Sequence, residues 1–343
     1  PNRTINAVFQ DSEGLLWVGT TNGLYQYDGS SVKHFSTKPN KENAIFTNLV
    51  CDITEDAEGN IIVALESGLS SYNKGEGQFT TLSKKVERYE TAWRDDFKRT
   101  WLSVAFNNAW LYAKDESTSQ LKLRSIISSK EFGNSSIGVI NDFETLSFNQ
   151  LLLASSNGLF HVDLSSSEVS NLGLGESLSV LHKLNGNDFL LGTSNEGLLH
   201  VRLSKYGIKE LGHYHFGSLN EVGGDHVTSI SVGQYGELLV STSKNVYQGI
   251  RGEEGFIFSS LIQDNRILKD NNVLTAYIDQ SGVYWVGTLR GLYKIRPSFL
   301  SVERLRVEVS KYNPLNQNVN YLFKEDEQKY WLGTSDDGFF TLN

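Results

Sequence analysis

The first candidates for chemistry in this chain are aspartates that recur at one position of a repeated phrase. Asp11, Asp56, Asp279 and Asp326 each open the same short phrase. Two carboxyl groups can hydrolyse a glycoside when they lie roughly 5–10 Å apart. Residues at one position of a repeat are spread around a ring, so these aspartates are too far apart to cooperate. We predict that they form turns and that the chain has no catalytic residues.

Histidines are the second chemical candidate. His213 and His215 form an H-x-H pair, and His226 follows later in the chain. On a strand, such a pair presents both imidazoles on one face, where zinc could bind them. No cysteine or paired carboxylate completes the ligand set in the sequence. We therefore predict no metal site, and no motif indicates a cofactor.

The phrase that the aspartates open predicts the fold. D-S-E-G-L-L-W-V-G-T-T-N-G-L-Y at residues 11–25 returns as D-Q-S-G-V-Y-W-V-G-T-L-R-G-L-Y at residues 279–293. An eroded version, D-E-Q-K-Y-W-L-G-T-S-D-D-G-F, occupies residues 326–339. Weaker versions bring the total to eight copies with a mean period of about 45 residues, typical of a propeller blade. The copies are expected near residues 5–35, 48–82, 92–127, 137–172, 178–212, 226–262, 272–309 and 318–343.

Each copy contains the signals of four strands. An alternating apolar run, such as I-N-A-V-F at residues 5–9, precedes a D-x-x-G turn in which glycine takes a positive φ. The second strand, L-L-W-V-G-T, is too apolar to have a solvated face, and its glycine allows a neighbouring backbone to approach closely. A third strand begins at G-L-Y. A looser outer strand, such as residues 302–307, completes the copy.

Four short strands cannot bury both faces of their sheet alone, so the copies are expected to stand around a ring as blades. The predicted fold class is therefore all-β: a β-propeller built from eight repeat copies, with residues 1–343 as one domain. We prefer a single eight-bladed ring. The alternative is a seven-bladed ring in which the eighth copy starts a second ring.

The best-preserved copy also carries a family resemblance. Its pattern F-x-D-x-x-G-L-L-W-V-G-T-x-x-G-L-Y-x-Y-D, at residues 9–28, resembles the two-component regulator propeller repeat. That resemblance implies the extracytoplasmic sensor region of a bacterial hybrid histidine kinase. In such receptors the propellers precede a small β-sandwich, a membrane helix and an output domain. The resemblance also implies a periplasmic location and, through downstream domains, a homodimer.

The amino-acid composition argues against two classes of binding partner, nucleic acids and membranes. The net charge of −9 argues against a nucleic-acid surface, which needs a basic stripe, and against binding to an anionic membrane. No run of 18 apolar residues is present, so we expect no membrane contact within this segment. Because the chain begins at Pro1 without a signal peptide, we expect a processed or excised segment.

The loops offer the candidate ligand site. Propeller loops between the second and third strands share one face with the blade-to-blade crossovers, and both sets are polar here. Trp17, Trp285 and Trp331 share one repeat position and are expected to pack between blades, whereas Trp101 departs from that register. Trp93 and Tyr89, in a loop-like segment, are expected to offer a stacking face. The predicted ligand-binding residues are Arg290, Asn22, Asn195, Glu196, Asp336, Asp337, Trp93 and Tyr89.

Two classes of function follow from these features. The first is a ligand-sensing module that responds to an oligosaccharide or another small polar ligand. The second is a propeller glycosidase or lyase, which would need a close pair of catalytic groups that breaks the repeat register. No such pair is visible, so we predict a sensor and not an enzyme. A protein-interaction scaffold, or the sensor of a cyclic-dinucleotide synthase, stays open.

Overall fold

A computed structural model of the chain describes residues 4–37, 44–83, 88–104, 108–114, 121–127, 137–205, 207–217, 226–253, 255–262, 272–296, 319–324, 330–334 and 339–342. Within these ranges, side chains are described for residues 4–104 and 137–296. The described residues form strands and turns, which confirms the all-β prediction. None of them belongs to a helix long and apolar enough to cross a membrane.

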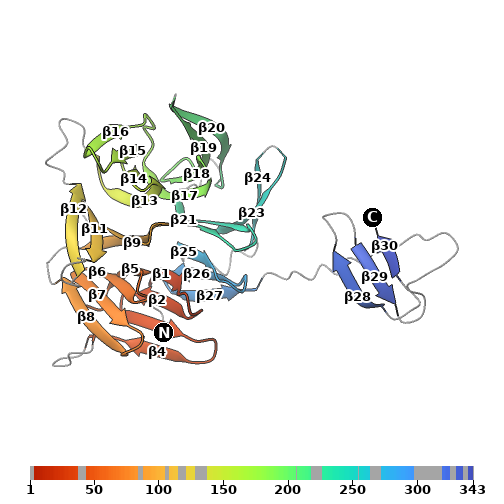
Figure 1. The fold of residues 1–343 in the computed structure, drawn as a ribbon, viewed down its shortest axis with the longest axis horizontal. Coiled ribbons are helices and arrows are strands. Elements are labelled where there is room, and N and C mark those ends of the chain that lie inside the picture. Colours follow the sequence, from red (N-terminus) through yellow and green to blue (C-terminus); the bar gives the residue numbers. More distant parts are fainter. Residues whose placement is uncertain are drawn as a thin grey trace. The chain divides into compact units, whose positions relative to one another are not determined.

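The chain divides into two compact units, Pro1–Pro297 and Ser298–Asn343. The first unit contains seven antiparallel sheets, and their first strands lie innermost around a common centre (Figure 1). In every sheet, consecutive strands pair with each other, so each blade is one contiguous stretch of chain. The second unit contains one sheet, formed by β28 (Val319–Lys324), β29 (Tyr330–Thr334) and β30 (Phe339–Leu342).

The first four blades lie within or close to the predicted copies. The first blade contains β1 (Ile5–Gln10), β2 (Leu16–Thr20), β3 (Gly23–Tyr27) and β4 (Val32–Phe35). The second contains β5 (Val50–Glu55), β6 (Ile61–Leu65), β7 (Gly68–Asn73) and β8 (Gln78–Ser83). The third contains β9 (Tyr89–Arg94), β10 (Thr100–Val104), β11 (Asn108–Lys114) and β12 (Leu121–Ile127). The fourth contains β13 (Ile140–Ser147), β14 (Gln150–Ser155), β15 (Gly158–Asp163) and β16 (Glu168–Asn171).

The remaining blades of the first unit continue the same order. The fifth contains β17 (Leu178–Asn185), β18 (Asp188–Thr193), β19 (Leu198–Ser204) and β20 (Gly207–Tyr214). The sixth contains β21 (Val227–Val232), β22 (Leu238–Thr242), β23 (Val246–Arg251) and β24 (Phe256–Ser260). The seventh contains β25 (Val273–Ile278), β26 (Tyr284–Thr288) and β27 (Gly291–Ile295).

The number of blades departs from the prediction. Six sheets have four strands and are complete blades, whereas the seventh has three strands within the described residues. The preferred eight-bladed ring is therefore wrong, and the described residues do not supply seven complete blades either. The eighth copy falls in the second compact unit. The outer strand predicted at residues 302–307 lies outside the described residues.

The repeated glycine of the second strand sets the spacing between blades. A Cβ atom on Gly19 would lie 2.6 Å from Cγ1 of Val50 in the next blade. On Gly192, it would lie 2.7 Å from Cγ1 of Val227. Neither glycine needs a left-handed φ, so close approach alone requires it. This confirms the predicted role, and it explains why strands such as β2 and β18 are buried along their whole length.

The ring closes between the seventh blade and the first. A Cβ on Gly287 would lie 2.7 Å from Cγ2 of Ile5, so the repeated glycine makes the same contact here. The backbone N–H of Gln280 donates to Oε1 of Gln10 at 2.7 Å. Oγ1 of Thr4 donates to a backbone carbonyl of the β26–β27 loop at 3.2 Å. The contact between the seventh and first blades thus resembles the contacts between blades that follow one another in sequence.

The predicted aspartate turns and tryptophan contacts are confirmed where they are described. Oδ1 of Asp11 accepts hydrogen bonds from the backbone N–H groups two and four residues later, at 3.0 and 2.9 Å. Oδ2 accepts from Nε1 of Trp17 at 2.8 Å, and Trp17 is fully buried. Asp279 and Trp285 repeat the bond at 2.8 Å. These carboxylates are used by their own turns, and Asp326 lies outside the described residues.

Trp101 corrects one expectation. It lies in the register of Trp17, because its Nε1 donates to Oδ2 of Asp95 at 2.9 Å and its side chain is fully buried. The third blade therefore keeps the aspartate-to-tryptophan spacing of the repeat. What it loses is the turn glycine, whose place is taken by Lys98 at a φ of 64°. The missing glycine made the register of Trp101 in this copy hard to recognise in the sequence.

Candidate functional site

The mouth of the central channel contains a polar cavity of about 500 Å³. Five innermost strands contribute to it: β9, β13, β17, β21 and β25. The lining residues are Glu90, Thr91, Ile140, Asn141, Ser179, Ser194, His226, Val227, Thr228 and Leu274. Hydroxyl, amide, imidazole and carboxylate groups therefore surround one cavity. Such a cavity suits a small polar ligand, which is held by a few convergent hydrogen-bonding groups.

One repeat position supplies much of this lining, and the sequence analysis missed it. On each innermost strand, one residue pairs with the repeated glycine of the second strand or with the residue that replaces it. The position directly before that residue holds Glu90, Asn141, Ser179 and Thr228 in the third to sixth blades. Asn6 holds this position in the first blade. A polar residue recurring at one point of an otherwise apolar strand was the signal that could have found them.

The same position ties neighbouring blades together. Its side chains donate hydrogen bonds to backbone carbonyls of the next innermost strand. These bonds run from Asn6 Nδ2 to Val50 O (2.7 Å), from Asn141 Nδ2 to Leu178 O (2.7 Å) and from Ser179 Oγ to Val227 O (2.6 Å). The amide oxygen of Asn141 and the hydroxyl oxygen of Ser179 keep acceptor capacity for a ligand.

The adjacent position carries two carboxylates that also join blades. Oδ2 of Asp52 accepts from the backbone N–H of Ala92 at 2.8 Å, and Oδ2 of Asp142 accepts from that of Leu181 at 2.9 Å. Burial raises the pKa of each carboxyl group to about 7, although these backbone hydrogen bonds act in the opposite direction. The negative charge near the channel consequently grows as the pH rises through neutrality.

The second and third blades add charge and a thiol to the channel. Nε of Arg88 pairs with Oε1 of Glu90 at 3.0 Å, so the carboxylate at the cavity is partly neutralised. Cys51 is half-buried, and burial raises the pKa of its thiol to about 12. A thiol with such a pKa is protonated at neutral pH and is a poor nucleophile. Cys51 therefore fills space at the channel.

The predicted loop residues lie beside the crossovers, as expected. A recurring hydrogen bond runs from the first residue of each loop to the crossover of the same blade, as from Ser194 N to Ser177 O at 2.9 Å. A threonine hydroxyl then fixes the loop, as where Thr193 Oγ1 accepts from Glu196 N at 2.7 Å. Asn22, Asn195, Glu196 and Arg290 all occupy such loops. Asp336 and Asp337 lie outside the described residues.

Arg290 lines a second cavity, of about 580 Å³, between the seventh blade and the first. Its walls are largely apolar and include the aromatic residues Tyr25, Tyr27 and Trp285. Nζ of Lys294 lies 4.8 Å from the centre of the Trp285 ring. The lining of this cavity shares no residue with that of the channel cavity, so Arg290 belongs to a separate surface.

The two predicted stacking residues are on a strand and not in a loop. Tyr89 and Trp93 belong to β9, because the first strand of the third blade begins at Tyr89. Tyr89 is 1% exposed and packs in an apolar cluster with Ile62 and Leu102. Trp93 is half-buried and packs against a cluster that contains Trp101. Neither of them lines the cavity of Arg290 or the channel cavity.

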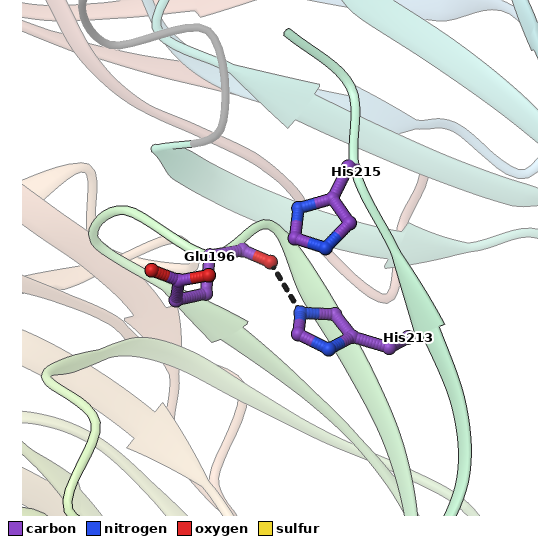
Figure 2. Close-up of side chains that lie close together, drawn as sticks. All are labelled: Glu196, His213 and His215. Atoms are coloured by element: carbon purple, nitrogen blue, oxygen red, sulfur yellow. Dashed lines mark hydrogen bonds between the residues drawn. The ribbon is translucent and has the colours of Figure 1, made fainter. Parts of the chain in front are cut away.

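The fifth blade gathers three side chains that can ligate a metal (Figure 2). Glu196 comes from the β18–β19 loop, His213 from the end of β20, and His215 from the residue that follows β20. One ligand atom from each lies within 4.8 Å of the other two. The histidine rings lie 4.3 Å apart, centre to centre. Sequence reasoning noted the histidines as a pair and predicted Glu196 as a loop residue of the ligand site, but it did not join them, because Glu196 is 17 residues from His213.

Comparison with known proteins agrees with the repeat and the fold. Residues 1–22 match the family model described as two component regulator propeller, which confirms the predicted resemblance for the first copy. A comparison with curated protein sequences finds no match.

Solved structures extend the likeness in fold to the whole chain. Two are extracellular domains of hybrid two component systems from B. thetaiotaomicron, with TM-scores of 0.67 and identities of 16% and 20%. They cover 100% and 99% of this chain, which spans 46% and 44% of theirs. A third is virginiamycin B lyase from Staphylococcus aureus, with a TM-score of 0.61 and 11% identity. It covers 85% of this chain, which spans 94% of it.

Proposed function

We propose that this chain is the ligand-sensing propeller of an extracytoplasmic receptor of the hybrid two-component type. It binds a small polar ligand, of which an oligosaccharide is the leading class, at the mouth of its channel. The observation that carries this proposal is the cavity of about 500 Å³ that takes four of its polar lining residues, Glu90, Asn141, Ser179 and Thr228, from one repeat position on successive blades. The match of the first copy to the regulator propeller supports the receptor context.

Binding without turnover is part of the proposal. The repeated aspartates are held in their turns, and the channel-facing thiol has a raised pKa. The carboxylates Asp52 and Asp142 accept backbone hydrogen bonds from the next blade, which gives them a structural task. The likeness to a lyase is one of fold and carries no activity with it. Any kinase or cyclase output would belong to other domains of the receptor.

The test is a binding experiment with an internal control. A panel of oligosaccharides is screened by thermal shift, and any ligand that stabilises the chain is titrated by calorimetry. Asn141→Ala removes a cavity-lining amide, and Asn6→Ala removes the same inter-blade hydrogen bond away from the cavity. We expect Asn141→Ala to weaken binding about tenfold or more, as for a lost partner in a desolvated site. Asn6→Ala should bind like the unaltered chain.

Two further variants locate the ligand. Glu90→Gln keeps the shape of the channel cavity and removes its charge, so it should also weaken binding. Arg290→Ala changes only the cavity between the seventh and first blades. If Arg290→Ala abolishes binding while Asn141→Ala does not, the ligand lies in that second cavity and the channel proposal fails. Conversion of a bound oligosaccharide into products by the unaltered chain would overturn the non-enzymatic part.

A further inference from the structure

We propose that Glu196, His213 and His215 bind a divalent transition metal ion of the zinc class at the rim of the fifth blade (Figure 2). This inference is independent of the sensed ligand. It also reverses the metal-free expectation from the sequence, because the fold brings a carboxylate to the two histidines.

The placement of the three groups suits a metal ion. His213 lies near the end of β20 and His215 follows its last residue, and their rings lie side by side with centres 4.3 Å apart. Their potential ligand atoms and that of Glu196 lie within 4.8 Å of one another. Around a zinc ion with bonds of about 2.1 Å, such atoms lie roughly 3.4 Å apart. All three side chains are exposed, so small rotations can close this difference.

A hydrogen bond already orients one of the imidazoles. Nε2 of His213 lies 2.7 Å from the backbone carbonyl oxygen of Glu196. A carbonyl can only accept, so Nε2 carries the proton and Nδ1 carries the lone pair. Histidines that bind metals commonly donate their second N–H to a carbonyl or carboxylate in this way. The nitrogen that makes this bond is also the one that faces Glu196 and His215 (Figure 2), so metal binding requires either that Nε2 releases the carbonyl or that the ring turns to present Nδ1, and the side chain of Glu196 supplies another ligand.

The first blade contains the same histidine-to-carbonyl hydrogen bond but neither the carboxylate nor the second histidine. His34 occupies the position of His213, and its Nε2 lies 2.9 Å from the carbonyl oxygen of Asn22, which corresponds to Glu196. Ser36 stands where the fifth blade has His215. The hydrogen bond from this histidine to the loop carbonyl thus has a structural role in both blades. The fifth blade differs by adding a carboxylate and a second imidazole, which together complete a three-ligand set.

The ligand types select the metal class. Imidazole nitrogen favours zinc, copper and nickel, whereas calcium and magnesium prefer sites built from oxygen ligands. Two histidines and one carboxylate leave room for water at a fourth position. A bound ion would tie the β18–β19 loop to the end of β20. Because Ser194 of this loop lines the channel cavity, the metal would stiffen one wall of the mouth.

The test uses the full chain after removal of metals with EDTA and desalting. Zinc is titrated by calorimetry above the ordinary imidazole pKa, and cobalt is used as a visible reporter of nitrogen and oxygen ligation. We expect one equivalent of zinc to bind to the unaltered chain. His215→Ala and Glu196→Gln should each weaken binding at least about tenfold. His34→Ala is the matched control and should bind zinc like the unaltered chain.

Circular dichroism first establishes that the variants are folded. Each outcome of the titrations then either supports or overturns the proposed metal site. Loss of binding in His215→Ala and Glu196→Gln, with binding retained in His34→Ala, supports the site. The absence of saturable zinc binding by the unaltered chain would overturn it. Unchanged affinity in both His215→Ala and Glu196→Gln would also overturn it, as would loss of binding in His34→Ala. A rise in thermal midpoint with zinc should follow the same pattern.

Discussion

Asp142 in the fourth blade accepts a hydrogen bond from the backbone N–H of Leu181 in the fifth, at 2.9 Å, through a carboxyl group whose pKa is raised to about 7 by burial. Two residues later along the same strand, Glu144 is 9% exposed, and burial raises its pKa to about 7 as well. It accepts from the backbone N–H of Lys183 at 3.3 Å. The joint between these blades thus contains two groups that titrate near neutrality.

The first prediction is that stability falls as the pH rises from about 4.5 to about 7. The raised pKa of Glu144 means that the folded protein holds a proton which the unfolded chain has already released. The resulting stabilisation is complete below the unfolded pKa and is lost as the pH rises through the folded one. Lys183 and Asp96 act on this pKa in opposite directions. Glu144→Gln should therefore flatten the decline in thermal midpoint between these pH values.

Asp163→Asn is the control for this measurement. Its carboxyl group is exposed, and hydrogen bonds from Ser165 lower its pKa, so it titrates below the chosen pH range. Its slope should match that of the unaltered chain. An equally steep slope in Glu144→Gln would show that Glu144 does not hold the proton.

The second prediction concerns the tryptophans between blades. Trp17→Ala and Trp285→Ala should each destabilise the fold by about 3–5 kcal/mol, as truncations of buried aromatic residues do. Each also removes the indole N–H that binds the turn aspartate at 2.8 Å. Denaturant unfolding measures the loss. Trp93→Ala should cost less because Trp93 is only half-buried. Wild-type melting in either of the first two variants would contradict their packing role.

The third prediction is that Lys98→Gly stabilises the third blade. Lys98 has a φ of 64°, a conformation that costs an L-residue roughly 1–2 kcal/mol. Glycine relieves this cost but adds about 0.5–1 kcal/mol of chain entropy to the unfolded state. A net gain of about 0.5–1 kcal/mol should appear in thermal unfolding. Lys98→Ala keeps the left-handed conformation and should not gain; equal stabilisation by both variants would exclude the backbone explanation.

The repeat made most of the fold predictable, because turns and buried strands depend on local residue types. In the copies that keep them, the turn aspartate, the glycines and the tryptophan have fixed tasks, so their spacing indicated blades directly. The number of complete blades was not predictable, because closure depends on which faces meet in space. Trp101 was misread for a local reason: Lys98 replaces the turn glycine that precedes the tryptophan in the better-preserved copies.

The candidate sites were less predictable because their residues come from different blades. Tyr89 and Trp93 looked like loop residues next to a charged stretch, yet both lie in β9. The channel lining was visible only as one position that is polar in five of the innermost strands, at Asn6, Glu90, Asn141, Ser179 and Thr228. Glu196 meets the two histidines through the pairing of β19 with β20, which no sequence spacing reveals.

The joint between Gly287 and Ile5 has a consequence for the architecture. Among the described residues, each sheet is built from one stretch of chain, and this joint uses the same glycine contact as the joint between Gly192 and Val227. The contact between the last and first blades of the described ring is therefore of the same kind as a contact between blades that are consecutive in sequence. Circular permutation at a crossover would leave every described sheet intact. Blades of this kind are modular units, which recombination could duplicate, delete or exchange without breaking a neighbouring sheet.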